Sequence, residues 1–265
     1  MSSFSLRRAF RAYAILLCGL GAFSAAGQQQ QPSSTPGIPN IQQLAPFEKL
    51  TYLIEWHGVN AGTAVIQRTK IPQDDWQFNL DLESAGLVTR LYRVSDHYKM
   101  ISNSHFCTLS TFLDAQEGKR HRQSQMTFHA PQRQMEYQDH DLVRNTTTRK
   151  QLNVNACTHD VVGAFATLRT IDLQPGKTAI LPVTDGKKMV NARVEAQAKE
   201  KITVGNKSYP TIRYEALLFD NVLYKRKGRL FIWVTDDADR LPVQMRVQLG
   251  FPIGTIQLQL QKQEK

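Results

Sequence analysis

A strict alternation of apolar and polar residues recurs from Tyr52 to Leu260 and constrains the fold more than any other feature of this chain. Between Val190 and Lys199, for example, small aliphatic residues alternate with Asn, Arg, Glu, Gln and Lys. Successive side chains of a β-strand point to opposite faces of a sheet, so a period of two indicates strands with one dry face and one wet face. The sequence therefore predicts an all-β domain.

Turn-forming residues divide this pattern into strands that follow one another along the chain. The first three lie within residues 47–83, and further strands are expected at 93–102, 105–114, 120–129, 133–139, 178–183, 188–199, 201–204, 210–218, 229–234, 241–249 and 254–261. Residues 141–153 are polar and are expected in an exposed hairpin or loop. About a dozen antiparallel strands must close or curl strongly to bury one apolar face and limit exposed edges. We therefore expect a single antiparallel, strongly curved sheet or barrel.

The alternation is interrupted in two places, where one or two short helices are expected. Residues 84–91 predict a short helix or a crossing loop. A helix is predicted after Thr158, which can cap the free amides of the first turn, and Leu173 to Gly176 ends it. Its apolar stripe consists of Val161, Phe165 and Leu168. Because this stripe must be buried, we expect the helix to cover an open end or edge of the sheet.

Residues 1–26 have the features of an export signal. Three arginines precede an apolar run from Ala12 to Ala22, and small residues ending at Ala26 offer a cleavage site. The apolar run is too short to span a bilayer comfortably. The export route stays open, because Arg7 and Arg8 resemble a twin-arginine signal but Leu6 stands where that signal has Ser or Thr.

Residues 27–46 are rich in Gln, Pro and Ser and contain few apolar side chains. Such a composition buries too little surface to order itself, so we expect a flexible linker. The folded, exported β-rich domain is then expected over residues 47–262. Once the signal is removed, the protein is expected to be periplasmic or secreted.

The chain is basic, with 33 Lys and Arg against 23 Asp and Glu. This balance suits contact with anionic lipid head groups or anionic cell-wall polymers. Most of the basic residues alternate singly along strands, as on a solvated sheet face, and only residues 119–122 and 225–229 form short basic runs. A nucleic acid partner is not expected, because no motif that reads nucleic acid occurs.

Two cysteines, Cys107 and Cys157, remain after removal of the signal that contains Cys18. In an oxidising compartment they could form a disulfide, which would close a long loop. Two free, buried thiols fit the sequence equally well, because it does not tell whether the two residues are adjacent in space.

No cluster of residues predicts a reaction or a bound metal. Asp236, Asp237 and Asp239 lack the alternate spacing and the glycine of a calcium loop, so they predict a hairpin turn whose carboxylates accept hydrogen bonds from nearby amides. The seven histidines form no close pair of the kind that binds zinc. The chain also lacks the Gly-x-Ser-x-Gly elbow, a phosphate-binding glycine loop and a dinucleotide fingerprint. We therefore name no catalytic residue, expect neither metal nor cofactor, and leave open whether the protein is an enzyme.

Several short motifs resemble the bacterial exported proteins grouped as domain of unknown function 3108. They include Trp56-x-Gly58-x-x-Ala61-Gly62-Thr63, Ser84-Ala85-Gly86-Leu87-Val88, Glu117-Gly118-Lys119-Arg120 and Ile232-Trp233-Val234-Thr235-Asp236-Asp237. The resemblance extends over roughly residues 47–262. It implies a periplasmic or envelope-associated β-rich domain and supplies no established activity.

The leading hypothesis for function is non-catalytic binding of an apolar ligand, such as a lipid or acyl chain, inside the curved sheet. Trp56, Phe165 and Trp233 are the candidate ligand-binding residues, although core packing explains most of the aromatic residues. One alternative is a structural or interaction module that meets envelope proteins or a cell-wall polymer, and a less favoured one is a hydrolase of envelope polymers. An integral membrane protein is not expected, because the interior helix, the basic balance and the polar C-terminal residues differ from an outer-membrane barrel.

Overall fold

The computed structural model describes residues 44–265. The predicted export signal, residues 1–26, and all but the last residues of the predicted linker, 27–46, lie outside the described residues. The first described strand begins at Phe47 and the last ends at Glu264.

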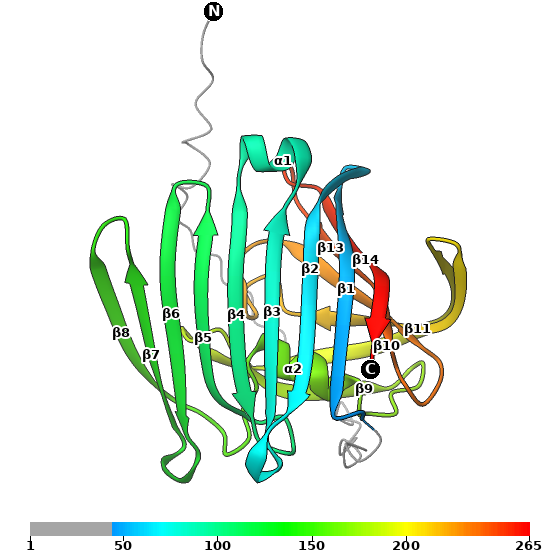
Figure 1. Ribbon diagram of the computed structural model, residues 1–265. Helices are drawn as coiled ribbons and strands as arrows, with labels where there is room; N and C mark the ends of the chain where they lie inside the picture. Colours follow the sequence, from blue (N-terminus) through cyan, green and yellow to red (C-terminus); the bar gives the residue numbers. More distant parts are fainter. Residues whose placement is uncertain (1–43) are drawn as a thin grey trace, which may run out of the picture. The chain divides into compact units, whose positions relative to one another are not determined.

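A single 14-stranded sheet, antiparallel throughout, forms the fold (Figure 1). Its order in space is β8-β7-β6-β5-β4-β3-β2-β1-β14-β13-β12-β11-β10-β9. The strands are β1 (Phe47–Trp56), β2 (Val59–Lys70), β3 (Trp76–Ser84), β4 (Val94–Ser102), β5 (Thr108–Glu117), β6 (Arg120–His129), β7 (Gln134–Asp141), β8 (Thr146–Asn153), β9 (Thr178–Thr184), β10 (Met189–Val204), β11 (Lys207–Leu217), β12 (Gly228–Thr235), β13 (Pro242–Leu249) and β14 (Thr255–Glu264). The predicted all-β class and single curved antiparallel sheet are confirmed.

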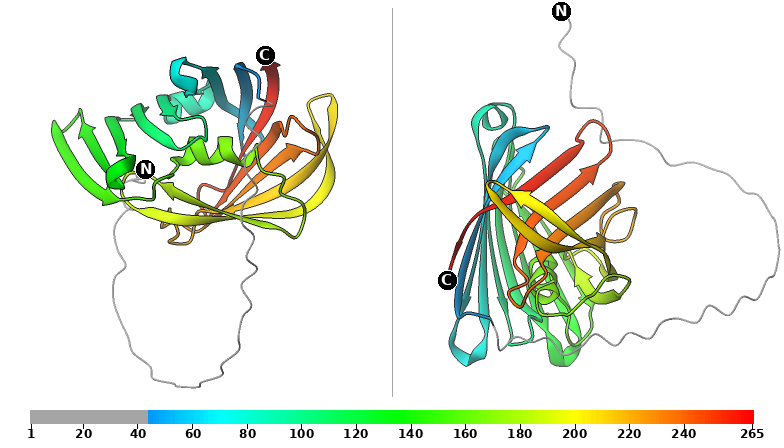
Figure 2. Two further views of the ribbon diagram at one scale, coloured as in Figure 1. Left: turned by 90° about the horizontal axis from the view of Figure 1, so that it is seen from below. Right: turned by 90° about the vertical axis from the view of Figure 1, so that its right-hand side faces the viewer.

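Two meanders, β1–β8 and β9–β14, are joined where the first and last strands pair. Tyr52 of β1 lies opposite Leu260 of β14, so the ends of the domain meet in the middle of the sheet. Within the described residues β8 and β9 remain the two edges, and the sheet curls without closing by backbone hydrogen bonds. Figure 2 shows the resulting curved sheet from two directions.

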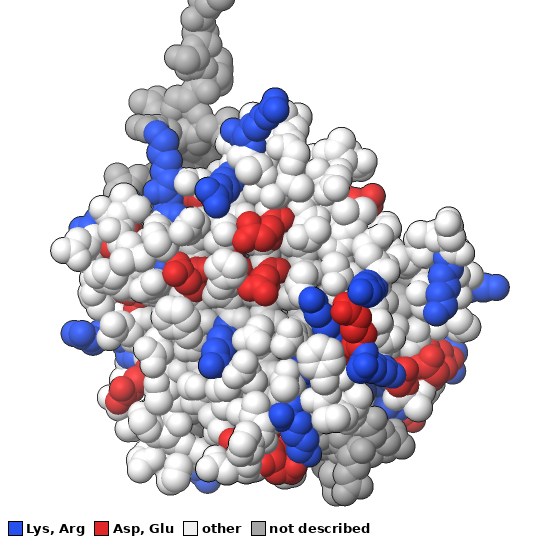
Figure 3. All heavy atoms as spheres, viewed as in Figure 1, with Lys and Arg blue, Asp and Glu red and all other residues white. Residues whose placement is uncertain are grey.

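The alternation of apolar and polar residues places their side chains on opposite faces of this curved sheet. Ala192, Val194 and Ala196 are buried on the concave side, whereas the residues between them are at least partly exposed. On the outer face of β1–β8, basic and acidic side chains are interspersed (Figure 3). This mixture is what a solvated sheet face requires, and it agrees with the single, alternating charges of the sequence.

The division between two of the expected strands is corrected by the structure. The separate strands expected at 188–199 and 201–204 are one strand, β10, because pairing with β11 continues through the charged residues and Glu200 lies opposite Thr211. A β-bulge between Ala196 and Ala198 moves the even-numbered residues that follow to the other face of the sheet, where Val204 packs in one cluster with Trp233. The polar residues 141–153 form a hairpin, as expected, whose second half is the exposed edge strand β8.

The helix predicted after Thr158 is present, with one correction to its capping, and residues 84–91, expected as a short helix or a crossing loop, contain a helix. Helix α1 (Gly86–Leu91) lies between β3 and β4, and α2 (Val161–Leu168) lies between β8 and β9. The N-cap of α2 is Asp160, whose carboxylate accepts hydrogen bonds from the amides of Val162 and Gly163 at 2.9 and 3.0 Å. Thr158 does not cap the helix, because its hydroxyl bonds within the preceding turn to Asn155 instead.

Helix α2 lies inside the curve of the sheet, not over an open end or edge as expected (Figure 2, left). One side of the helix packs through Ala164 and Leu168 into the core formed by β9–β12. Its other side packs through Ala166 and Val162 against Trp76, Phe78, Met100 and Phe106. The helix is therefore buried between the two halves of the sheet and fills the space that the curve encloses.

Candidate functional site

Three charged side chains are buried together beside the C-terminal end of α2. Glu48 of β1, Arg68 of β2 and Arg169 are 2, 4 and 7 % exposed. Arg169 donates two hydrogen bonds to the Glu48 carboxylate, at 2.5 Å from Nη1 and 3.1 Å from Nη2, and Nη1 of Arg68 lies 3.3 Å from the same carboxylate. Gln263 of β14 adds a further hydrogen bond at 2.8 Å. A single carboxylate thus joins α2 to three strands.

The two guanidinium groups determine the protonation of this cluster. Burial by itself would raise the pKa of Glu48, but the hydrogen bonds and charges of Arg169 and Arg68 outweigh it and hold the pKa below its usual value. Burial lowers the pKa of Arg68 to about 10, against the attraction of Glu48. Glu48 and Arg68 therefore stay charged at neutral pH, and the cluster contains two guanidinium groups for one carboxylate.

Arg169 also connects α2 to the turn between β12 and β13. Its Nε donates to the carbonyl oxygen of Arg240, and its Nη2 donates to that of Asp239, each at 3.2 Å. Beside the charged cluster, between α2 and β1–β3, lies a cavity of about 20 Å³ lined by apolar side chains and the two arginines. A cavity of this size holds about one water molecule and no acyl chain.

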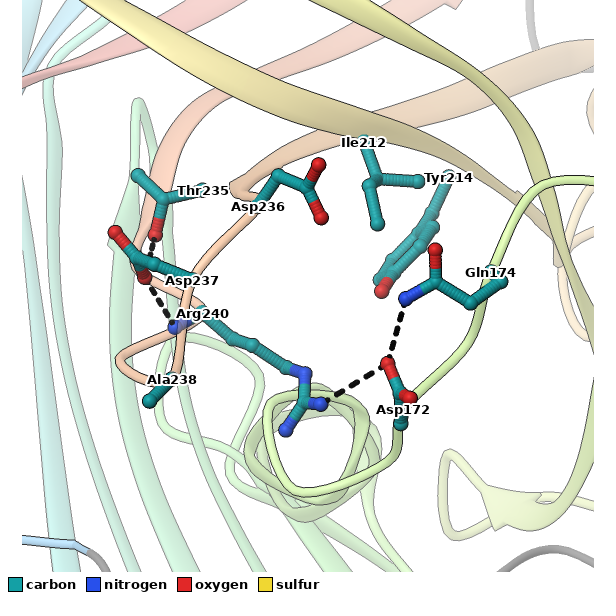
Figure 4. Close-up of a pocket in the computed structure, with 9 residues that line it drawn as sticks. All are labelled: Asp172, Gln174, Ile212, Tyr214, Thr235, Asp236, Asp237, Ala238 and Arg240. Atoms are coloured by element: carbon teal, nitrogen blue, oxygen red, sulfur yellow. Dashed lines mark hydrogen bonds and ion pairs between the residues drawn. The ribbon is translucent and has the colours of Figure 1, made fainter.

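A more open pocket of about 150 Å³ lies at the β12–β13 turn, and its walls are mostly polar (Figure 4). Arg240 reaches across it to Asp172 at 3.1 Å, and Gln174 donates to the same carboxylate at 2.7 Å. The Gln174 hydrogen bond and the charge of Arg240 keep the pKa of Asp172 below its usual value. Asp236, on another wall, pairs with Lys199 at 2.8 Å.

The turn that forms one wall of this pocket is held by Asp237. Its carboxylate accepts from the hydroxyl of Thr235 at 2.6 Å and from the amides of Asp239 and Arg240 at 3.1 and 3.2 Å. Asp236, Asp237 and Asp239 therefore lie in a hairpin turn, as their spacing indicates. Within it, the Asp237 carboxylate accepts hydrogen bonds from backbone amides.

Tyr214, on β11, supplies the unusual group of this pocket. Its side chain is fully buried, and its hydroxyl has no hydrogen-bond partner among residues 44–265. Burial raises the pKa of Tyr214 to about 12, so the hydroxyl is neutral at physiological pH. Figure 4 shows the phenol pointing into the space above Asp172 and Arg240. A buried polar atom without a protein partner is rare in proteins, and an ordered water molecule can supply the missing hydrogen bond.

The three candidate ligand-binding residues lie in different places and do not form one site. The indole of Trp56 donates to the carbonyl of Ile253 at 2.6 Å, at the end of the sheet where β1 and β14 meet the β13–β14 turn. The indole of Trp233 donates to Glu200 at 2.6 Å, and the guanidinium of Arg246 lies 5.0 Å from the centre of its ring. Phe165 packs on the core beneath α2 and lines the small cavity.

Cys107 and Cys157 are joined by a disulfide. It connects the loop after β4 to the segment that leads into α2, close to His159. His159 is buried and donates from Nδ1 to the carbonyl of Phe106 at 2.7 Å. Burial lowers the pKa of His159, so the imidazole stays neutral. The disulfide and this hydrogen bond together hold the start of α2 inside the sheet.

Among residues 44–265, no group of three or more His, Cys, Asp or Glu side chains is arranged to hold a metal ion. Within the same residues, no helix combines the length and the apolarity that a membrane span requires.

The buried ion cluster was not predicted, although the sequence contains a signal for it. Glu48 has the same strand parity as Leu50, Tyr52 and Ile54, and Arg68 has the parity of Ala64 and Ile66. A charged residue at an inward position needs a buried partner of opposite charge. The pattern could therefore have marked both residues, but not Arg169, which lies beyond the end of α2.

Comparison with known proteins places the fold and the family. A search of curated proteins gave no significant match. The chain is similar in structure to a β-barrel-like protein of domain of unknown function 1849 from Brucella abortus, with a TM-score of 0.54 and 7 % sequence identity. The alignment covers 82 % of this chain and 97 % of that protein, and at this identity it shows the fold alone. The model of the family described as "Protein of unknown function (DUF3108)" matches residues 51–261, so the chain belongs to that family.

Proposed function

We propose that this protein is a non-catalytic interaction module of the cell envelope, which acts through its outer surface and not through a ligand held inside. The observation that carries the proposal is the position of α2, which occupies the concave side of the sheet and packs against both of its halves. A curved sheet of this kind would hold an apolar ligand in that same space. The envelope location follows from the predicted export signal in residues 1–26.

The volumes support an interior without a ligand. Pockets that bind small molecules usually enclose about 300–1,000 Å³ and are mostly apolar. The apolar cavity beside α2 measures about 20 Å³, and the larger pocket, at about 150 Å³, is lined by Asp172, Asp236, Asp237 and Arg240. An acyl chain therefore fits neither.

Native mass spectrometry of the gently purified protein, followed by titration with a fluorescent acyl probe, tests this proposal. We expect the mass of the polypeptide alone and no probe binding. A Phe165→Ala variant is the matched control, because it removes an aromatic ring from the wall of the small cavity and creates room for a probe. A co-purified lipid in stoichiometric amount, or saturable probe binding by the unmodified protein, would contradict a packed interior.

A second candidate function is binding of a small polar ligand in the pocket of Figure 4, favoured by the unpartnered hydroxyl of Tyr214. The pocket has more carboxylates than cations, which suits a ligand that offers hydroxyl or ammonium donors. Glucosamine, which has both, is the probe, and N-acetylglucosamine is the matched neutral sugar. We expect glucosamine to raise the Tm of the wild-type protein and to have a smaller effect on Tyr214→Phe. Equal shifts in both proteins would exclude Tyr214 from binding.

A further inference from the structure

Several turns lie together at one end of the sheet, the upper end in Figure 1. We define the upper rim as residues 57–60, 85–93, 117–120, 142–145 and 250–254. Hydrogen bonds connect neighbouring parts of this rim: the amide of Ala85 donates to Ala61 at 2.9 Å, and that of Gly118 donates to Arg93 at 2.7 Å. The right-hand view of Figure 2 places α1, the β1–β2 turn and the β13–β14 turn at the same end.

Most of the large apolar side chains that residues 44–265 expose to solvent lie on this rim. Phe251 is 100 % exposed and Leu91 is 71 % exposed, both at the outer ends of their turns. The main members of this set on the rim are Val59, Leu87, Leu91, Tyr92, Val143 and Phe251. The turns at the opposite end of the described sheet, residues 71–75, 103–107, 130–133 and 235–241, contribute none of that set. Apolar side chains gathered at one end mark a surface that another body covers.

The two ends of the sheet also differ in charge. Residues 85–93 and 117–120 carry Arg90, Arg93, Lys119 and Arg120 against one acid, Glu117. The turns of the opposite end are acidic on balance, with Asp74, Asp75, Asp236, Asp237 and Asp239 against Arg133 and Arg240. Basic side chains are visible along the upper part of the face in Figure 3. The rim thus combines exposed apolar tips with positive charge.

We propose that the upper rim docks on the surface of an anionic lipid bilayer, with Leu91 and Phe251 entering the head-group region and Arg90 and Lys119 pairing with lipid phosphates. This inference rests on the proposed interaction module and names its partner. Apolar tips flanked by cations are the two components of interfacial membrane binding. Each basic residue near an anionic surface contributes about 1 kcal/mol, or roughly a fivefold change in partitioning.

Co-sedimentation of the protein with lipid vesicles tests the inference. The protein is purified from cells in the form in which they accumulate it. The unmodified protein is expected to bind vesicles that contain phosphatidylglycerol, and to bind phosphatidylcholine vesicles much more weakly. Leu91→Ser and Phe251→Ser are each expected to weaken binding about tenfold, since each removes a large apolar side chain from the bilayer surface. Arg90→Gln and Lys119→Gln are each expected to weaken it about fivefold, and added salt is expected to weaken it further.

The matched control substitutions change residues that have similar exposure and chemistry but do not belong to the upper rim. Ile180→Ser changes an exposed apolar residue on the edge strand β9, and Lys201→Gln changes an exposed lysine on β10, where it lies opposite Pro210. Both are expected to leave vesicle binding unchanged. All six positions are exposed, so circular dichroism should confirm an unchanged fold in every variant.

Trp56 provides a second readout, because its indole bonds to the β13–β14 turn whereas Trp76 and Trp233 are buried elsewhere. Brominated lipid is expected to quench part of the tryptophan fluorescence, and Trp56→Phe should remove the quenched part. Absent vesicle binding, or equal losses in the rim and control variants, would overturn the inference. If rim variants instead lose a crosslinked protein partner in cells while vesicles are ignored, the bilayer inference fails and the interaction module stands.

Discussion

Arg169 at the end of α2 and Glu48 of β1, 121 residues apart in the chain, form a buried two-point ion pair with N–O distances of 2.5 and 3.1 Å. This pair fixes the helix inside the sheet, because Arg169 continues to the β12–β13 turn while Glu48 is held by Arg68 and Gln263. The position of the helix, and with it the packed interior, depends on this contact.

Loss of one partner is expected to destabilise the protein strongly. Arg169→Met leaves the Glu48 carboxylate buried with less compensation, and breaking a buried pair in this way costs about 3–5 kcal/mol. Urea unfolding at neutral pH measures the change. The control is Arg193→Met, whose exposed pair with Glu195 should contribute no more than about 1 kcal/mol. Equal effects of the two substitutions would show that the buried pair does not hold the helix.

The disulfide is expected to stabilise the fold by restricting the unfolded chain. Cys107 and Cys157 are separated by 50 residues, and closing a loop of that length contributes about 4 kcal/mol in the chain-entropy description. The double variant Cys107→Ser/Cys157→Ser should unfold at correspondingly lower urea concentration. Alkylation of the denatured protein followed by mass measurement checks the bond itself: neither cysteine should react until a reductant is added.

The β9–β10 hairpin should tolerate no side chain at Gly186. This glycine has φ of +86°, and a Cβ there would lie 2.3 Å from the ring of Tyr137 on β7. Gly205, in the β10–β11 turn, also has positive φ, at +55°, but nothing lies within 4 Å of its Cβ position. We expect Gly205→Ala to cost about 1–2 kcal/mol from backbone strain alone. Gly186→Ala should cost about 1–3 kcal/mol more from overpacking.

Thermal or urea unfolding of both glycine variants measures this difference. In the background of Tyr137→Ala, which removes the ring that clashes, Gly186→Ala should cost no more than Gly205→Ala costs. If Gly186→Ala and Gly205→Ala are equally stable, a side chain at position 186 does not clash with the Tyr137 ring on β7.

Asp96 is expected to make stability depend on pH in the range from about 4 to 6. Burial, with a contribution from Glu117, raises the pKa of Asp96 to about 6, and within the described part of the chain one of its carboxylate oxygens has no hydrogen-bond partner. The folded state therefore keeps a proton that the unfolded state releases, so stability falls as pH rises through this range and then levels off. Asp96→Asn removes the cost of ionisation and should stabilise the protein by about 1–3 kcal/mol at pH 7 but not at pH 4.

Asp114 on the neighbouring strand β5 provides a control of opposite sign. Hydrogen bonds from Gln123 and His121 outweigh the effect of its burial and lower the pKa of Asp114. Its ionised form favours the folded state, so Asp114→Asn should lose stability at neutral pH. Urea unfolding of both variants across the pH range makes the comparison. A stabilising Asp114→Asn, or an Asp96→Asn without effect at pH 7, would contradict these assignments.

The local pattern of the sequence determined the class of fold, the number of strands to within a few and the presence of α2, because strand parity, turn residues and helical periodicity act over a few neighbours. It also contained the inward parity of Glu48 and Arg68, which could have marked them as buried charges. The pairing of β1 with β14, the placement of α2 inside the curve and the meeting of Arg169 with Glu48 were decided by the tertiary structure. The first and the last of these contacts join residues more than a hundred positions apart, and all three are set by how the whole sheet curls, which no local periodicity encodes.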